Sequence, residues 1–89
     1  MEVKIDRSFQ RDTRRIQDIT VLKKVAETII SVSKAESTSK IKNLRKLKGS
    51  AEGYRIKIGN YRIGIIISGS TVKFIRCLHR KDIYKFFPG

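Results

Sequence analysis

The sequence predicts an α+β fold in which one β-sheet packs against one layer of helices. Its 89 residues fit a single domain, 1–89, and leave no room for a second one. A hydrophobic content of 39% is enough for one such core. The apolar residues follow helical spacing in the first half and alternate singly from Tyr54 onward. Helices are therefore expected first and strands after them.

The first half is predicted to hold one short strand followed by helices. Val3 and Ile5 alternate with polar neighbours, as in a strand. Ser8 is a candidate N-cap for a short helix, and Asp18 or Thr20 for a longer one. The short helix carries Phe9, Asp12 and Ile16, and the longer one carries Leu22, Val25, Ile29 and Val32.

A third stretch of the first half repeats the helical spacing. Ile41, Leu44 and Leu47 form an apolar stripe that Gly49 closes. The polar segment 34–39 separates this stripe from the preceding helix. We therefore expect one more helical turn or two before the strands begin.

The second half is predicted to form three consecutive antiparallel strands. The strands are expected at 54–58, 61–67 and 71–78, with a final turn or tail at 81–87. Gly59-Asn60 is a strong signal for a two-residue hairpin turn, and Gly69-Ser70 is a second one. Two-residue turns define the pairing of the strands. The expected pairs are Ile58–Tyr61, Lys57–Arg62, Arg55–Gly64, Arg62–Cys77, Ile63–Arg76 and Ile65–Phe74, with His79 opposite Asn60.

This register sorts the side chains onto two faces of the sheet. The apolar face should lie on the helices and carries Arg76 as its only misfit; its other members are Tyr54, Ile56, Ile58, Tyr61, Ile63, Ile65, Val72, Phe74 and Leu78. The opposite face carries Arg55, Lys57, Arg62 and His79, with Gly64 leaving open space beside Arg55. Like charges across a sheet repel. The cluster is therefore either a phosphate site, which Arg and Lys suit, or a merely solvated polar face.

The charge balance points to a polyanionic partner. Twenty-one Lys and Arg face eight Asp and Glu, which gives a net charge of +13. The longest apolar run, 63–67, is too short to span a membrane, and the N-terminus lacks the apolar core of a signal peptide. The single cysteine, Cys77, excludes an internal disulfide and is expected in the core of a cytoplasmic protein.

The segment from Leu44 to Pro88 resembles the C-terminal half of RelE/ParE superfamily toxins. The resemblance rests on Leu-x-x-Leu-x-Gly, Tyr-Arg-Ile-Lys-Ile, Gly-x-Tyr-Arg-Ile and His-Arg-x-x-x-Tyr. It implies a β-α-α-β-β-β fold: an antiparallel C-terminal three-stranded meander, an N-terminal edge strand, and a helical hairpin on one face. It also implies the toxin of a type II toxin–antitoxin system, inhibited by an acidic or amphipathic, RelB-like antitoxin that wraps it.

Members of the RelE branch cut mRNA, typically in the ribosomal A site, which implies contact with mRNA and ribosomal RNA. The positions that match the functional residues of this branch are Arg55, Lys57, Arg62, Arg80 and Tyr84. Two departures accompany the match: Arg55 replaces a Lys, and the spacing from Arg80 to Tyr84 is the shorter form. The ParE branch shares the fold, poisons DNA gyrase and lacks much of this basic and aromatic set.

These residues suit RNA cleavage without a metal or other cofactor. The eight carboxylates are scattered, and one His and one Cys cannot form a zinc site. Cleavage through the 2′-hydroxyl needs only a base, cations for the phosphorane and an acid, and leaves a 2′,3′-cyclic phosphate. Arg62 and Arg80 are the expected phosphate ligands, and Lys57 is the expected base. Arg55 would assist, Tyr84 would stack on a base or position the 2′-hydroxyl, and His79 is either the proton donor or a structural residue.

Further basic residues are candidates for ribosomal RNA contacts, or else belong to a solvated surface. They are Arg11, Arg14, Arg15, Lys23, Lys24, Lys46 and Lys48. Three functions remain open at this stage: a ribosome-dependent mRNA endonuclease, a gyrase inhibitor of the same fold, and a non-catalytic RNA-binding protein.

Overall fold

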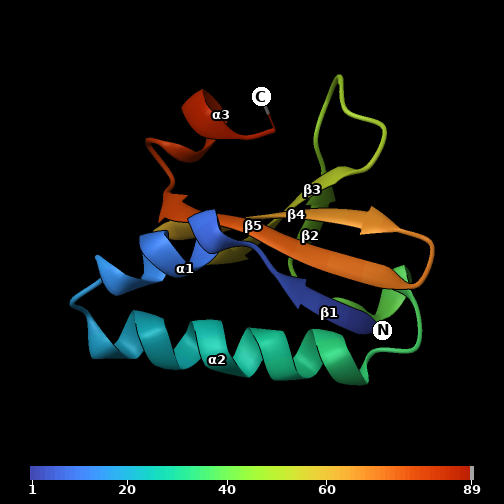
Figure 1. Cartoon of the computed structure of the whole chain (residues 1–89), viewed down its shortest axis with the longest axis horizontal. Helices are drawn as coiled ribbons and strands as arrows, with labels where there is room; N and C mark the ends of the chain where they lie inside the picture. The colour runs from blue at the N-terminus through green and yellow to red at the C-terminus, as the bar shows by residue number, and fades with distance from the viewer. Residues whose placement is uncertain (89) are drawn as a thin grey trace.

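A computed structural model describes residues 1–88 and has the predicted α+β architecture (Figure 1). The sheet has five strands in the order β1-β5-β4-β3-β2, and β1 is the only strand that runs parallel to its neighbour among the described residues. The strands are β1 (Glu2–Ile5), β2 (Leu44–Lys46), β3 (Gly53–Ile58), β4 (Tyr61–Ser68) and β5 (Thr71–His79). The helices are α1 (Arg7–Arg14), α2 (Ile19–Lys34), the 3₁₀ turn η1 (Thr38–Lys40) and α3 (Ile83–Phe86).

Helices α1 and α2 cover one face of the sheet, and α3 lies on the other side (Figure 1). Between the helical layer and the sheet is the main core, with Phe9, Val32 and Phe74 among its buried residues. The rings of Phe9 and Phe74 meet edge to face with 5.4 Å between their centroids. Most of the apolar residues predicted to face the helices are buried in this core; they are Ile56, Ile58, Ile63, Ile65, Val72 and Phe74.

The two main helices begin at aspartates. Asp18 caps α2 and accepts a hydrogen bond from the Thr20 amide at 2.9 Å, which confirms one of the two predicted caps. Asp6 caps α1 by accepting from the Ser8 amide at 3.1 Å, so the expectation that Ser8 is the cap is wrong by two residues. The Ser8 hydroxyl also donates to the Asp6 carboxylate, at 2.6 Å; this hydrogen bond, the one from the Ser8 amide and the nearby Lys73 ammonium lower the pKa of the Asp6 carboxyl.

The stripe at 41–47 is not helical, which corrects a prediction. Residues Leu44–Lys46 form the edge strand β2, which pairs with β3 so that Arg45 lies opposite Arg55. Leu44 packs on the main core and Leu47 belongs to a second cluster with Ile83 and Phe87. A spacing of three fits one face of a helix, but in a strand it places side chains on opposite faces. Here both faces of the sheet hold apolar clusters, so the side chains at both ends of the stripe are buried.

The second hairpin is predicted correctly only near its turn. Ile65 lies opposite Phe74 as expected, but a bulge between Gly64 and Ile65 shifts the remaining register by one residue. The observed pairs are Ile63–Cys77, Gly64–Arg76, Arg62–Leu78 and Tyr61–His79. Cys77 therefore enters the main core, Leu78 packs in the second cluster, and Arg76 leaves the apolar face on which it was a misfit.

Candidate nucleic-acid-cleaving site

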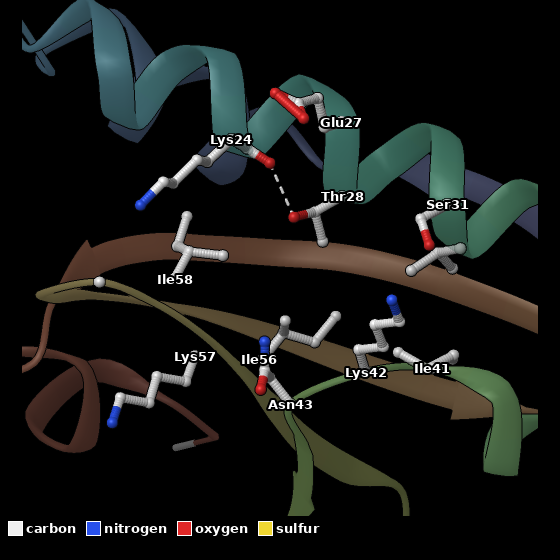
Figure 2. Close-up of a pocket in the computed structure, with 12 residues that line it drawn as sticks. Lys24, Glu27, Thr28, Ser31, Ile41, Lys42, Asn43, Ile56, Lys57 and Ile58 are labelled. Carbon is white, nitrogen blue, oxygen red and sulfur yellow. Dashed lines mark hydrogen bonds between the residues drawn. The ribbon is translucent and has the colours of Figure 1, made fainter.

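The cations of the first hairpin lie on the sheet face opposite α1 and α2. Lys57 lies opposite Arg62, and Arg55 lies opposite Gly64, as the two-residue turn predicts. Figure 2 shows Ile58 pointing toward α2 and Lys57 pointing to the opposite side of the sheet. Because side chains alternate along a strand and pair across it, these three cations share one face.

Arg55 is half-buried and retains unused hydrogen-bonding capacity. One terminal nitrogen donates to the Asn43 carbonyl at 3.1 Å. Its Nε is buried and has no hydrogen-bond partner among residues 1–88. An unpaired buried donor costs free energy in the folded protein.

Arg62 and Arg80 both meet the turn between β3 and β4. The guanidinium of Arg62 donates to the carbonyls of Gly59 and Tyr61, each at 2.9 Å. The amide of Arg80 donates to the Asn60 carbonyl at 2.8 Å, and its side chain is exposed. Both arginines therefore bond to the segment that joins β3 to β4, Arg62 through its guanidinium and Arg80 through its backbone amide, although they are 18 residues apart in the sequence.

His79 does not share the face of the three cations, which corrects its predicted place. The bulge in β5 puts His79 opposite Tyr61, whose ring packs on the main core. The two rings are edge to face at 5.7 Å. The His79 Nδ1 accepts from the Lys81 amide at 3.2 Å, so the neutral ring carries its proton on Nε2. His79 thus lies at the end of β5, on the helical side.

The C-terminal segment covers part of the sheet face that carries Arg55, Lys57 and Arg62. Ile83 and Phe87 are buried against Leu78 and Leu47, whereas Tyr84 is 58% exposed. The expected open space beside Arg55 is absent because the Phe87 ring occupies it. A Cβ built on Gly64 would lie 2.6 Å from the nearest atom of that ring. Glycine at this position therefore lets the tail lie directly on the sheet, with Tyr84 turned outward.

Asp12 is a central residue that the sequence reasoning did not single out for the site. It is 3% exposed and accepts hydrogen bonds from Arg76 Nε at 2.7 Å and from the Cys77 amide at 2.9 Å. The carboxylate raises the pKa of the Arg76 guanidinium, which also lies 5.4 Å from the centroid of the Phe86 ring. Asp12 thereby connects α1, β5 and α3. An acid on the apolar side of a helix is the signal that could have revealed it.

The other predicted RNA contacts are exposed but come from separate elements. Arg11, Arg14 and Arg15 belong to the end of α1, and Lys23 and Lys24 to the first half of α2. Lys48 follows β2. Lys46 is engaged locally, because its ammonium lies 5.0 Å from the Tyr54 ring centroid and donates to the Ala51 carbonyl. The structure therefore does not gather the whole set into one patch.

Within residues 1–88, no group of three or more His, Cys, Asp and Glu side chains could hold a metal ion. In the same range, no helix has the length and apolar character needed to cross a membrane.

The chain matches proteins of known class over almost its whole length. The family model described as the ParE toxin of the type II toxin–antitoxin system parDE matches residues 3–84. Toxin RelE3 of Methanocaldococcus jannaschii is 37% identical over 89 residues, which cover 99% of this chain and all of that protein.

Solved structures have the same fold. The RelB–RelE antitoxin–toxin complex from Methanococcus jannaschii matches with a TM-score of 0.81 and 35% identity, over 96% of this chain and 99% of that chain. The toxin–antitoxin complex RelBE2 of Mycobacterium tuberculosis matches with a TM-score of 0.70 and 22% identity, over 89% of this chain and 96% of that chain. Isolated Escherichia coli RelE matches with a TM-score of 0.62 and 15% identity, over 88% of this chain and 82% of that chain. At such identities the last two show the fold alone.

Proposed function

Because the chain belongs to the ParE toxin family of type II toxin–antitoxin systems, we propose that it is a toxin that cleaves mRNA on the ribosome. The observation that carries this proposal is the cation cluster formed by Arg55, Lys57 and Arg62 on one sheet face. Its relative named RelE3 and the resemblance of residues 44–88 to the RelE branch support the same conclusion. A cognate antitoxin is the expected partner, and mRNA and ribosomal RNA in the A site are the proposed targets.

The proposed reaction is metal-independent transfer of the scissile phosphate to the neighbouring 2′-hydroxyl. The 2′-oxygen attacks phosphorus, the bond to the 5′-oxygen breaks, and the products carry a 2′,3′-cyclic phosphate and a 5′-hydroxyl. Lys57 takes the proton of the 2′-hydroxyl. Arg62 and Arg80 stabilise the extra negative charge of the phosphorane, and Arg55 orients or assists the base.

Tyr84 and His79 take roles outside the cation cluster. The exposed ring of Tyr84 stacks on a base of the RNA and holds it against the sheet. His79 protonates the leaving 5′-oxygen through Nε2, provided that the RNA reaches the end of β5 beside Arg80. Since His79 lies on the other face, replacing it should reduce cleavage less than replacing Arg62.

Arg62→Ala is the decisive variant. Its guanidinium bonds only to carbonyls of its own turn, so the fold should survive its removal. We expect loss of mRNA cleavage in a purified translation system, with unchanged circular dichroism and thermal unfolding. Lys4→Ala is the matched control, because Lys4 is an exposed cation on the opposite edge strand, and it should cleave normally. A folded Arg62→Ala protein that still cleaves would contradict the assignment.

The ends of the cut RNA test the chemistry. A 5′-hydroxyl accepts phosphate directly from polynucleotide kinase, whereas a 5′-phosphate must first be removed. Direct labelling of the downstream fragments is expected. Fragments that need prior dephosphorylation would exclude transfer to the 2′-hydroxyl.

Inhibition of DNA gyrase is the second candidate, because the matching family model is described as the parDE toxin. A supercoiling assay with purified gyrase separates the two. We expect no inhibition at toxin concentrations that stop translation. Gyrase inhibition without mRNA cuts would select the second candidate, and growth without either effect would leave a non-catalytic RNA-binding protein.

A further inference from the structure

The C-terminal helix α3 is a single turn, and two buried residues anchor it on the sheet. Ile83 and Phe87 both belong to the second apolar cluster, and the Phe87 amide donates to the Ile83 carbonyl at 2.9 Å. Two anchors on one side of so short a helix leave its rotation about the line between them weakly restrained. A third contact away from that line is needed to fix the direction in which the exposed Tyr84 points.

Arg76 of β5 supplies such a third contact. Its guanidinium lies 5.4 Å from the centroid of the Phe86 ring, and Phe86 is 53% exposed and belongs to neither apolar cluster. A cation over an aromatic face is attracted by the quadrupole of the ring. Each residue turns a helix by about 100°, so Phe86 and Tyr84 extend from nearly opposite sides of α3. A rotation that lifts the Phe86 ring from Arg76 therefore also swings Tyr84.

Arg76 is held in turn by Asp12 of α1. The Nε and one terminal nitrogen of Arg76 donate to the two carboxylate oxygens of Asp12, at 2.7 Å and 3.1 Å. A bidentate carboxylate fixes the plane of a guanidinium as well as its position. Helix α1 covers one face of the sheet and α3 lies on the other side (Figure 1). The ion pair thus gives α3 a reference point outside the C-terminal segment.

We propose that Asp12, Arg76 and Phe86 are positioning residues that fix the direction of Tyr84 at the RNA site. The inference rests on the proposed function, in which the Tyr84 ring stacks on a base of the RNA. A stacking group must be held to within about 10–20° of its productive orientation. Loss of the Phe86 contact should therefore slow cleavage by releasing Tyr84, while the anchors Ile83 and Phe87 keep the protein folded.

Phe86→Ala tests the inference, and Phe86→Tyr is the conservative variant that keeps a ring over Arg76. Ile19→Ala is the matched control, because it also truncates an exposed apolar side chain, at the start of α2. The value of kcat/KM for mRNA cleavage on purified ribosomes is measured at a temperature at which circular dichroism shows each variant folded. Phe86→Ala should lower kcat/KM about tenfold. Phe86→Tyr and Ile19→Ala should stay within about twofold of the wild type.

The Tyr84→Ala background separates positioning from other roles of Phe86. The cation cluster is intact in that protein, so its slower cleavage is followed under single-turnover conditions. If Phe86 acts only through Tyr84, adding Phe86→Ala should change the rate by less than about twofold. Losses that multiply would show that Phe86 contacts the RNA itself or supports the whole fold, and would overturn the inference. A Phe86→Ala protein that cleaves like the wild type would overturn it as well.

Arg76→Gln tests the other partner of the contact. Glutamine can still donate a hydrogen bond to Asp12 but places no charge over the Phe86 ring. We expect a loss in kcat/KM of about tenfold, and no further loss beyond about twofold when Phe86→Ala is added. Wild-type cleavage by Arg76→Gln, or a double variant whose losses multiply, would remove Arg76 from the positioning contact.

Measurements on the free protein distinguish failure of this inference from failure of the proposed function. Nitrogen-15 relaxation gives the order parameters of the backbone amides at 84–86, which should fall from about 0.85 in the wild type toward about 0.6 in Phe86→Ala. Unchanged order parameters would overturn the inference. If the wild type cleaves no mRNA, the proposed function fails, and the order parameters still decide whether Phe86 fixes α3.

Discussion

At the scale of single residues, Asp12 connects the sheet to the helices that pack against it. Asp12 is the only buried charged side chain in the described part of the chain, and it serves two donors of β5. The amide of Cys77 lies beyond the end of β1, where β5 pairs with β4 on one side and has no strand on the other. The Asp12 carboxylate takes the place of that missing strand. One helix residue therefore satisfies a strand edge and holds Arg76 beside the C-terminal helix.

Asp12→Ala should lower the free energy of unfolding by about 3 kcal/mol, because it leaves the Arg76 charge and the Cys77 amide without their partner. Urea denaturation measures the change. The double variant Asp12→Ala/Arg76→Met removes the stranded charge as well, so it should be more stable than Asp12→Ala alone. Equal stability of the single and double variants would show that the unpaired Arg76 charge costs nothing.

Cys77 should be unreactive in the folded protein. It is 1% exposed, and burial raises the pKa of its thiol from 9.0 to about 12. About one thiol in ten thousand is then ionised at pH 8, so iodoacetamide should modify the protein only in denaturant. A raised pKa favours folding below about pH 9, and this contribution is lost as the pH rises toward 12. Rapid alkylation of the native protein would contradict the placement.

At the scale of elements, the C-terminal segment gives the sheet a second apolar cluster on the face opposite α1 and α2. Helices α1 and α2 cover one face, and the tail from α3 to Phe87 covers part of the other (Figure 1). The tail places Tyr84 next to the cation face by burying its neighbours Ile83 and Phe87. The bulge in β5 determines which side chains share that face, because it shifts every later residue to the other side.

Gly64→Ala should detach the tail, because the added Cβ would overlap the Phe87 ring. The expected cost is about 1–3 kcal/mol in the free energy of unfolding, together with faster hydrogen exchange at residues 83–87. Phe87→Ala removes the obstacle and itself costs about 3 kcal/mol. The double variant should therefore be no less stable than Phe87→Ala alone. Additive losses would show that Gly64 is required for another reason.

At the scale of the whole molecule, a net charge of +13 dominates the long-range field. The charge is divided between two surfaces with different neighbours. The sheet face carries Arg55, Lys57 and Arg62, which are the residues of the proposed RNA site. The hollows between α2 and the strands β2 and β3 have lysines around aliphatic residues.

RNA binding should depend steeply on salt, because cations of the toxin release counterions from the phosphates. We expect the logarithm of the association constant for single-stranded RNA to fall with the logarithm of salt with a slope of about −3, which corresponds to four or five phosphates at about 0.7 each. Fluorescence anisotropy between 50 and 300 mM salt, about a sixfold range, resolves such a slope. Arg62→Ala should make the slope shallower by about 0.7, and a flat response would contradict the RNA site.

Local patterns were sufficient for much of the fold. The change from helical spacing to alternation predicted helices followed by strands, and Gly59-Asn60 predicted the register that places Arg55, Lys57 and Arg62 together. These features depend on neighbouring residues and on the turn conformations that they favour. The same is true of the Asp18 cap.

Long-range contacts decided the rest. An apolar spacing of three at 41–47 suits a helix or an edge strand, and only the free edge of β3 selects the strand. The bulge that separates His79 from the three cations forms where β1 gives way to α1 beside β5, and no local signal marks it. Phe87 reaches Gly64 across 23 residues. The sequence by itself determined which residues are apolar, charged or turn-forming, whereas tertiary packing determined which of the charged residues share a surface.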